Sequence, residues 1–268
     1  VTCKLKKLNA NKRNKYRNRI YCISKSIGIY LYRLSANRED AKDIVQDTYL
    51  KVTQKIETFK GESSFKTWCF SIATNLAKDN QRVKNRWKLE VQDDCKNASL
   101  STPKYQQRIL TSFQNQTEQQ FEIAEHINYC FTCIAKNLDL EEQIAVILKE
   151  FYHFKRTEIG HILGKTEGIV KHLLYNGRQE LQTKYNKRCS LINKTGVCYQ
   201  CAELNDFLQE KPNSAEKISK MKLSLDNNSE TNLDIRFSII NQLNPLNQKA
   251  SDLEDTILQI LREVIDDK

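Results

Sequence analysis

A set of polar and basic side chains late in the sequence has the composition and spacing of a surface that binds duplex DNA. The set consists of Glu167, Lys171, His172, Tyr175 and Arg178. Most of these residues follow one another at steps of three or four, which places them on one face of a helix. Lysine, arginine and histidine donate hydrogen bonds to base edges and phosphates in the major groove, which admits a helix. The exposed side of an ordinary helical hairpin would have the same composition, so these residues alone leave both interpretations open.

The elements around this face predict a helix-turn-helix. Apolar residues at helical spacing predict helices over 157–163 and 166–185, with Gly164 at the turn between them. The side chains expected to point inward are Ile159, Ile162, Ile169, Val170, Leu173 and Leu174. The second helix would therefore present its polar face outward.

A second group of functional side chains lies on an earlier predicted helix. Trp68, Asn75, Asp79 and Arg82 follow at spacings of seven, four and three, which places them on one shoulder of that helix. The helix follows a Gly-Glu-Ser-Ser turn, with Ser63 or Ser64 as the expected N-cap. Its buried side is expected to contain Phe65, Cys69, Ile72, Ala73 and Leu76.

The helix before that turn begins near Glu39 and has an acidic outer face. Its apolar stripe is Ala41, Ile44, Val45, Thr48, Val52 and Ile56. The opposite face carries Asp43, Gln46, Asp47 and Leu50. From the residues alone, this face is most simply interpreted as a solvated acidic surface.

Five of the nine cysteines have spacings that suit a metal site. Cys130 and Cys133 form a CxxC pair, and Cys189, Cys198 and Cys201 form a Cx8CxxC pattern. Four thiolates complete a tetrahedral structural zinc site, while small thiols inside helices are also common core residues. The odd number of cysteines, without a secretion signal, argues against a disulfide framework. Structural zinc, thiol-based sensing and ordinary buried cysteines all remain open, and no cofactor is required.

Length and composition favour a helical protein that binds a polyanion. The chain has 268 residues with a net charge of +10, and residues 1–20 contain eight Lys and Arg but no acidic residue. With only seven Gly and three Pro, few tight turns are expected. No apolar run reaches the length of a membrane span and no signal peptide is recognised, so we expect a cytoplasmic location.

The two helical blocks resemble a known family of bacterial proteins. AKDIVQDTYLKV, TFKGESSFKTWCFSIATNLAKD and the basic QRVKNR are similar to region 2 of the sigma-70 family, in its extracytoplasmic-function (ECF) group. The later block, LEEQIAVILKEFYHFKRTEIGHILGKTEGIVKHLLYNGRQEL, resembles region 4 of the same family. The order of the blocks also fits, although about 80 residues follow region 4, where typical members end soon after it.

This resemblance implies roles for particular residues. Asp43, Gln46 and Asp47 match the surface that docks on core RNA polymerase. Lys66, Thr67, Trp68, Asn75, Asp79 and Arg82 fall where the family melts and reads the −10 promoter element. The outer face of the helix-turn-helix would read the −35 element as duplex DNA. Captured single-stranded bases need aromatic, amide or carboxylate and basic partners, which agrees with this assignment; Phe65 is expected to be mainly core and Trp68 to be shared.

We therefore expect an all-α protein with two small helical domains, a flexible linker and a helical C-terminal extension. The predicted division is region 2 at 1–90, a polar linker at 91–120, region 4 at 121–188, and a cysteine-containing extension at 189–268. The resemblance implies a sigma factor that binds core polymerase and promoter DNA, with an anti-sigma factor as a further partner and neither catalytic residues nor a small-molecule substrate. The alternative is a stand-alone helix-turn-helix regulator with a thiol- or metal-sensing segment.

Overall fold

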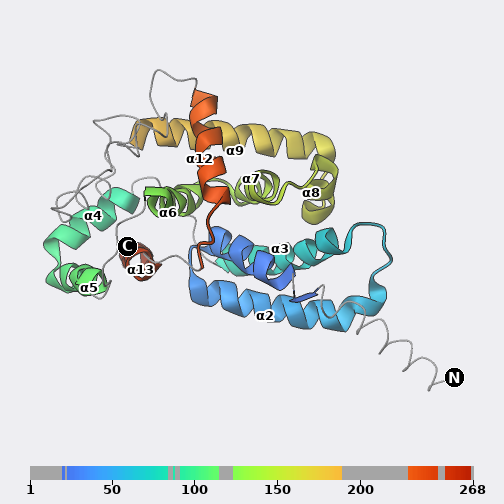
Figure 1. The fold of residues 1–268 in the computed structure, drawn as a ribbon, viewed down its shortest axis with the longest axis horizontal. Coiled ribbons are helices and arrows are strands. Elements are labelled where there is room, and N and C mark those ends of the chain that lie inside the picture. Colours follow the sequence, from blue (N-terminus) through green and yellow to red (C-terminus); the bar gives the residue numbers. More distant parts are fainter. Residues whose placement is uncertain are drawn as a thin grey trace. The chain divides into compact units, whose positions relative to one another are not determined.

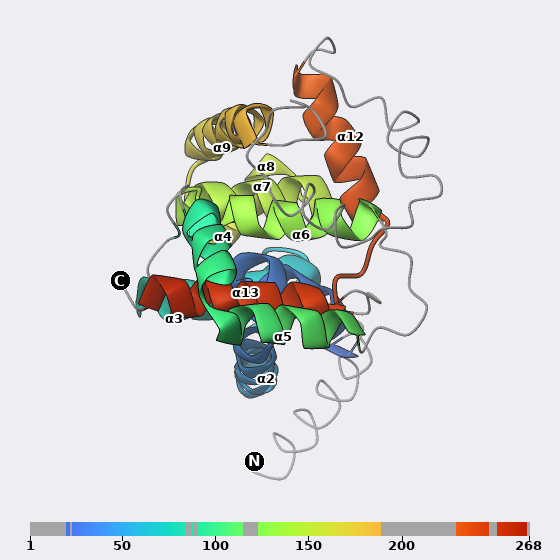
Figure 2. The same cartoon turned by 90° about the vertical axis from the view of Figure 1, so that its left-hand side faces the viewer.

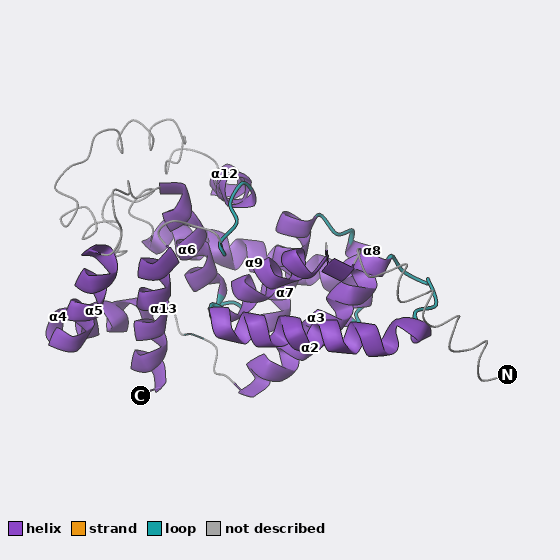
Figure 3. Ribbon diagram, turned by 60° about the horizontal axis from the view of Figure 1, so that its bottom comes forward, coloured by secondary structure: helices purple, strands orange, loops and turns teal. Residues whose placement is uncertain are grey.

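The computed structural model describes residues 20–21, 23–83, 87, 91–114, 123–188, 229–246 and 251–266. The regular elements in these ranges are all helical, as the secondary-structure colours of Figure 3 show. The prediction of an all-α chain is thus confirmed. In the same ranges, no helix combines the length and hydrophobicity that crossing a membrane would require.

The chain folds into two compact units, and each contains segments that are distant in sequence. Unit 1 combines residues 1–85 with 140–174, and unit 2 combines 86–139 with 175–268. The boundary on the C-terminal side falls within one helix, α9 (Glu167–Arg188). These units differ from the predicted division at residues 90, 120 and 188, because helices 140–152 and 156–163 pack with region 2 instead of forming a module of their own.

Unit 1 is built on two neighbouring helices, α2 (Arg38–Lys55) and α3 (Phe65–Val83), which pack against each other (Figure 1). The side chain of Asn37 starts α2 by accepting hydrogen bonds from the amides of Glu39 and Asp40. A short 3-10 turn, η1 (Ile56–Thr58), follows α2. The predicted apolar stripe of α2 is confirmed, since Ala41, Ile44, Thr48, Val52 and Ile56 are buried and Val45 is half-buried. On α3, Phe65, Cys69 and Ala73 are buried, while Ile72 and Leu76 are half-buried.

Helices from the second predicted module complete the core of unit 1. They are α7 (Leu140–Tyr152), α8 (Arg156–Leu163) and the first part of α9. The ring of Phe70 on α3 lies 5.1 Å from the rings of both Tyr152 and Phe154, measured between centroids. Phe70 is fully buried, so the aromatic core around α3 depends on residues about 80 positions later in the sequence.

A polar contact joins the helical segment 23–35 to α7 in the same unit. The side-chain amide of Gln143 donates a hydrogen bond of 3.0 Å to the carbonyl of Arg33, and both residues are buried. The guanidinium of Arg33 lies 4.3 Å from the centroid of the Phe151 ring. Burial lowers the pKa of Arg33, although the neighbouring Tyr152 opposes this shift. The contact between the guanidinium and the Phe151 ring therefore offsets part of the free-energy cost of burying the charge of Arg33.

Unit 2 contains α4 (Val91–Ser101), α5 (Pro103–Gln114), α6 (Ile123–Ala135), the end of α9, α12 (Ser229–Asn241) and α13 (Ser251–Asp266). Helix α13 packs against both α4 and α5 (Figure 2). Arg108 on α5 forms a salt bridge of 2.7 Å with Glu263 on α13. The apolar face of α13, including Ile257, Leu258 and Leu261, is buried.

The prediction of a flexible linker at 91–120 is wrong for residues 91–114, which form α4 and α5. The sequence there is polar, but three of its apolar side chains, Val91, Cys95 and Tyr105, are buried. Their helices pack against α13, which lies about 150 positions later in the sequence. Helical structure in this segment therefore depends on tertiary burial more than on local periodicity.

Candidate nucleic-acid interface

The N-terminal end of α3 presents a cluster of aromatic rings. The hydroxyl of Ser64 accepts a hydrogen bond of 3.0 Å from the amide of Thr67, so Ser64 is the N-cap, as one of the two predicted candidates. The ring of Trp68 lies 5.2 Å from that of Phe59 and 5.8 Å from that of Phe65. As predicted, Phe65 is buried and Trp68 is only half-buried. The half-buried indole leaves an aromatic surface that a base could stack on.

Two of the predicted −10 residues face the second module within unit 1. The Thr67 hydroxyl donates a hydrogen bond of 3.1 Å to the Glu158 carboxylate, and Thr67 is only 1% exposed. The ammonium of Lys66 donates to the Tyr152 carbonyl at 3.2 Å and lies 4.5 Å from the centroid of the Phe154 ring. Partial burial lowers the pKa of Lys66, and the charge of Glu158 opposes this shift. In this conformation, both side chains are bound to protein groups.

The remaining −10 residues lie further along α3. Asn75 and Asp79 are exposed, so α3 also presents an amide in its middle and a carboxylate toward its C-terminal end. Arg82 lies in the last turn of α3, but its side chain is outside the described residues. The predicted shoulder is therefore present in α3 with two accessible polar groups.

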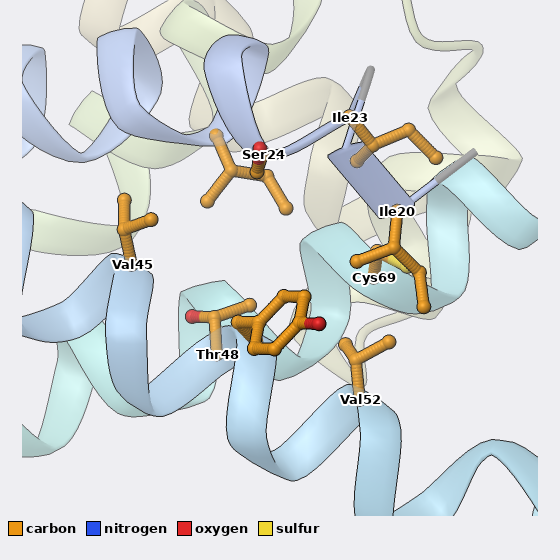
Figure 4. Close-up of a pocket in the computed structure, with 9 residues that line it drawn as sticks. Ile20, Ile23, Ser24, Val45, Thr48, Val52 and Cys69 are labelled. Carbon is orange, nitrogen blue, oxygen red and sulfur yellow. The ribbon is translucent and has the colours of Figure 1, made fainter. Parts of the chain in front are cut away.

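The acidic outer face of α2 is exposed, as the sequence predicts. Asp43, Gln46 and Asp47 are exposed, and so are the neighbouring apolar side chains Tyr49 and Leu50, at 48% and 54%. Behind this face, Figure 4 shows a small pocket whose side chains come from the segment at 20–27, α2 and α3. Its lining is almost entirely apolar, which makes it part of the packing of α2 and α3. The accessible chemistry on this helix is thus the mixed acidic and apolar outer face.

The helix-turn-helix has a tightly constrained turn. Gly164 has a φ of +66°, and the amide of Lys165 donates a hydrogen bond of 2.9 Å to the carbonyl of Gly160. A Cβ atom on Gly160 would lie 2.7 Å from the Lys165 carbonyl oxygen, so only glycine fits without a shift of the backbone. The guanidinium of Arg156, at the start of α8, pairs with Glu167, at the start of α9, over 3.1 Å.

The predicted outer face of α9 is largely confirmed as exposed. Glu167, Lys171, His172 and Tyr175 are exposed, with Tyr175 at 64%. Arg178 is half-buried because its guanidinium forms a salt bridge of 2.6 Å with Asp234 of α12. Val170 is buried as predicted, but Ile169, which was also predicted to point inward, is 44% exposed. Leu173 is half-buried, while Leu174, Ile159 and Ile162 are buried as predicted.

A carboxylate bridge connects the two predicted DNA-binding elements within unit 1. Glu141 on α7 accepts from Lys78 of α3 at 2.7 Å and pairs with Lys165 of the helix-turn-helix turn at 3.1 Å. Burial alone would raise the pKa of Glu141, but the hydrogen bonds and charges of the two lysines outweigh it and lower the pKa. Glu141 is therefore ionised and holds both lysines in place.

The predicted zinc site stays a prediction. Cys189, Cys198 and Cys201 lie outside the described residues, while Cys130 and Cys133 are buried in α6 at 4% and 0% exposure. Among the described residues, no three His, Cys, Asp or Glu side chains lie together in a way that could hold a metal ion. Metal analysis of the full chain prepared without added zinc would test the site.

Three contact residues at these surfaces could not be identified from sequence periodicity. The ring of Phe59 lies 5.2 Å from that of Trp68, and its place just before the Gly61 turn is the one local hint that it lies at this end of α3. Glu158 and Asp234 bind Thr67 and Arg178 across 91 and 56 positions, respectively. No local pattern indicates such distant partners.

Comparison with known proteins agrees with this geometry. The family model for sigma-70 region 2 matches residues 29–87, which contain α2, the turn and α3. The chain is 27% identical over 159 residues to the ECF RNA polymerase sigma factor SigE of Mycolicibacterium smegmatis, covering 59% of this chain and 57% of that protein. It is 28% identical over 158 residues to the RNA polymerase sigma factor YlaC of Bacillus subtilis, covering 59% of this chain and 84% of YlaC.

A solved structure of the sigma factor RpoE from Bartonella quintana, in complex with the anti-sigma factor NepR, aligns over 64% of this chain and 97% of that chain. The sequence identity is 20% and the TM-score is 0.45, values too low to support an inference about this chain. The region 2 match and the sequence relatives provide the stronger grounds. By these comparisons the chain is similar to the sigma-70 family in region 2, and to extracytoplasmic-function sigma factors over somewhat more than half of its length.

Proposed function

We propose that this protein is an ECF-type sigma factor that binds core RNA polymerase and directs it to specific promoters. One observation carries the proposal: the region 2 match coincides with helices α2 and α3, which present an exposed acidic face and an aromatic shoulder. The exposed basic face of α9 supplies the duplex-binding element that such a protein needs. The sigma-factor names of the relatives support the same proposal.

The proposed mechanism consists of binding steps. The acidic face of α2 would dock on a basic surface of core polymerase, where charge complementarity guides association. Helix α9 would enter the major groove at the −35 element. The rings at the start of α3 and the polar groups of Asn75 and Asp79 would then hold bases of the melted −10 strand.

Because each of these steps is a binding event driven by binding energy, the proposal needs no catalytic residue and no small-molecule substrate. It also implies a location with the transcription machinery in the cytoplasm, and an anti-sigma factor as a natural regulator. The alternative, a stand-alone helix-turn-helix regulator, would bind duplex DNA without polymerase. It explains α9 but gives no role to the region 2 surface.

Run-off transcription tests the proposal directly. The full chain is combined with core RNA polymerase on a library of promoter fragments, and the transcripts are sequenced. We expect transcripts that start at a fixed distance from shared −35 and −10 sequences. Core polymerase alone is the control, and equal transcription without the chain would refute the proposal. Failure of the chain to bind core polymerase, with duplex binding intact, would instead favour the stand-alone regulator.

The docking face has its own test. Asp43→Lys and Asp47→Lys place a positive charge opposite the basic surface of polymerase, and each should weaken binding by about 1–3 kcal/mol. Asp266→Lys is the matched control, because Asp266 is exposed near the end of α13, away from α2 in sequence and in unit 2. Competition binding to core polymerase measures the effect. Unchanged competition by both α2 variants would exclude this face.

A further inference from the structure

Helix α12 contacts a residue that the proposed function assigns to −35 binding. The Nη2 atom of Arg178 lies 2.6 Å from the Oδ1 atom of Asp234, and its guanidinium carbon lies 5.6 Å from the centroid of the Phe237 ring. Both partners belong to α12, which lies in the same compact unit as the C-terminal part of α9. The Arg178 side chain keeps only 22% of its surface exposed. The guanidinium is thus bound by a carboxylate and covers an aromatic ring.

Helix α12 is anchored in unit 2 by side chains next to those that hold Arg178. Phe237 is 3% exposed and packs edge-on against Phe131 of α6, with 5.9 Å between ring centroids. Arg236 is 1% exposed, and its guanidinium lies 4.3 Å from the centroid of the Tyr185 ring on α9. Leu233 and Ile240 are also buried. Since α12 is fixed by its own core contacts, Asp234 is held beside Arg178.

This arrangement opposes DNA binding at Arg178 in two ways. A guanidinium that donates to a carboxylate has fewer donors for a guanine edge or a phosphate. The Asp234 side chain is also 59% exposed, so its negative charge lies beside the surface that phosphates would approach. The rest of the outer face, from Lys171 to Tyr175, remains exposed, so the contact affects one end of the predicted interface.

We propose that α12 is a built-in cover of the −35-binding surface, which competes with promoter DNA for Arg178. The proposal rests on the proposed function, because it regulates the same surface. The chain would bind the −35 duplex at full strength only after the contact between Asp234 and Arg178 opens. The apparent affinity for the −35 element is then reduced by the fraction of molecules in which α12 is in place.

Removing the carboxylate tests the cover. Asp234→Ala in the full chain, assembled with core polymerase, should bind labelled promoter duplex about three- to tenfold more tightly than the unmodified chain. Asp266→Ala is the matched control, because it removes the same charge at another exposed position in unit 2 and should leave affinity unchanged. The probe is a promoter fragment recovered by run-off transcription, and affinity is measured before melting.

A double-mutant cycle separates competition from a general change of charge. Arg178→Ala should weaken duplex binding, and adding Asp234→Ala to it should give no further gain, because the contact is already absent. Equal gains in both backgrounds would overturn the cover. Unchanged affinity for Asp234→Ala, with weaker binding by Arg178→Ala, would also overturn it and leave the proposed function standing. Absence of promoter binding and transcription by every chain would overturn both proposals.

Discussion

The two predicted DNA-binding surfaces differ in how much of each is already bound by protein. On α9, Lys171, His172 and Tyr175 are exposed, while Arg178 is paired with Asp234 of the C-terminal extension. At the start of α3, Thr67 is buried under Glu158 and Lys66 is held by the Tyr152 carbonyl. The face of α9 proposed to bind duplex DNA is mostly accessible, whereas the end of α3 proposed to hold melted bases is partly covered by α8.

This difference matches the different demands of the two tasks. A duplex presents its edges and phosphates on the outside, so a preformed exposed helix face is sufficient. A base that has left the stack needs a pocket, and an uncovered pocket would expose aromatic surface to water. Partial cover at α3 therefore costs little before melting, while cover at α9 would hinder the first encounter with DNA.

The largest expected effect comes from removing the α3 shoulder. Trp68→Ala combined with Asn75→Ala should lower open-complex formation about 100-fold or more, because stacking and a hydrogen bond to melted bases are both lost. Binding of the closed complex should change little. Permanganate reactivity at the −10 region reports melting, and duplex affinity reports the earlier step.

Trp68→Phe is the control for that variant, because it keeps an aromatic ring against Phe59. Its open-complex formation should stay close to that of the unmodified chain. If the double variant lost both steps equally, the shoulder would have no special role in melted DNA. The proposed difference between the two surfaces, duplex binding by α9 and capture of melted bases by α3, would then be contradicted.

A smaller effect is expected on the duplex-binding face. Lys171→Ala should weaken −35 binding by about 1–3 kcal/mol if the ammonium contacts a base edge. If it contacts a phosphate, the loss should be similar for all sequences and the salt dependence should become less steep. Lys187→Ala is the control, since this exposed residue lies about 160° around the same helix. If both variants had the same −35 affinity and salt dependence, Lys171 would not be part of the DNA interface.

The turn that positions α9 should respond to the addition of one methyl group. Gly160→Ala should lower the free energy of unfolding by about 1–3 kcal/mol, because its Cβ atom would meet the Lys165 carbonyl oxygen at 2.7 Å. Gly168→Ala adds the same atom in α9, where the nearest neighbour is 3.9 Å away, and should instead stabilise by about 0.5–1 kcal/mol. Thermal unfolding measures both, and a loss in both variants would contradict this account of the turn.

The smallest effect concerns the bridge between α3 and the turn before α9. A carboxylate whose pKa is lower in the folded chain than in the unfolded chain stabilises the folded state at pH values above its ordinary pKa. This contribution disappears as the pH falls through the pKa of the folded state. Glu141→Gln should therefore cost less than about 1 kcal/mol at neutral pH, since the group is one-quarter exposed. The difference from the unmodified chain should shrink below about pH 4.5. A difference that stays constant through this range would exclude ionisation as its cause.

Local sequence pattern predicted the elements that carry both surfaces. The helices at 38–55, 65–83, 156–163 and 167–188, the Ser64 cap and the exposed acidic face are as expected. These features follow from helical periodicity and from capping, which depend on residues within a few positions of one another.

Features that depend on distant segments could not be predicted in this way. Helices α4 and α5 form in a polar stretch because α13 packs against them. The partners of Thr67 and Arg178 come from other helices, so neither the cover at α3 nor that at α9 has a local signature. Periodicity also misplaced Ile169, because it lies near the turn, where the spacing of buried residues changes.

The buried thiol of Cys69 makes unit 1 suitable for a kinetic measurement of local opening. Burial raises its pKa to about 12, so the group stays protonated and unreactive near neutral pH. It lies on α3 within the apolar pocket of Figure 4, one residue after Trp68. A thiol reagent could modify it only while α3 separates from its neighbours. The labelling rate of Cys69, distinguished from that of the other eight cysteines by peptide mass spectrometry, would therefore report local opening of the helix to which we assign −10 binding.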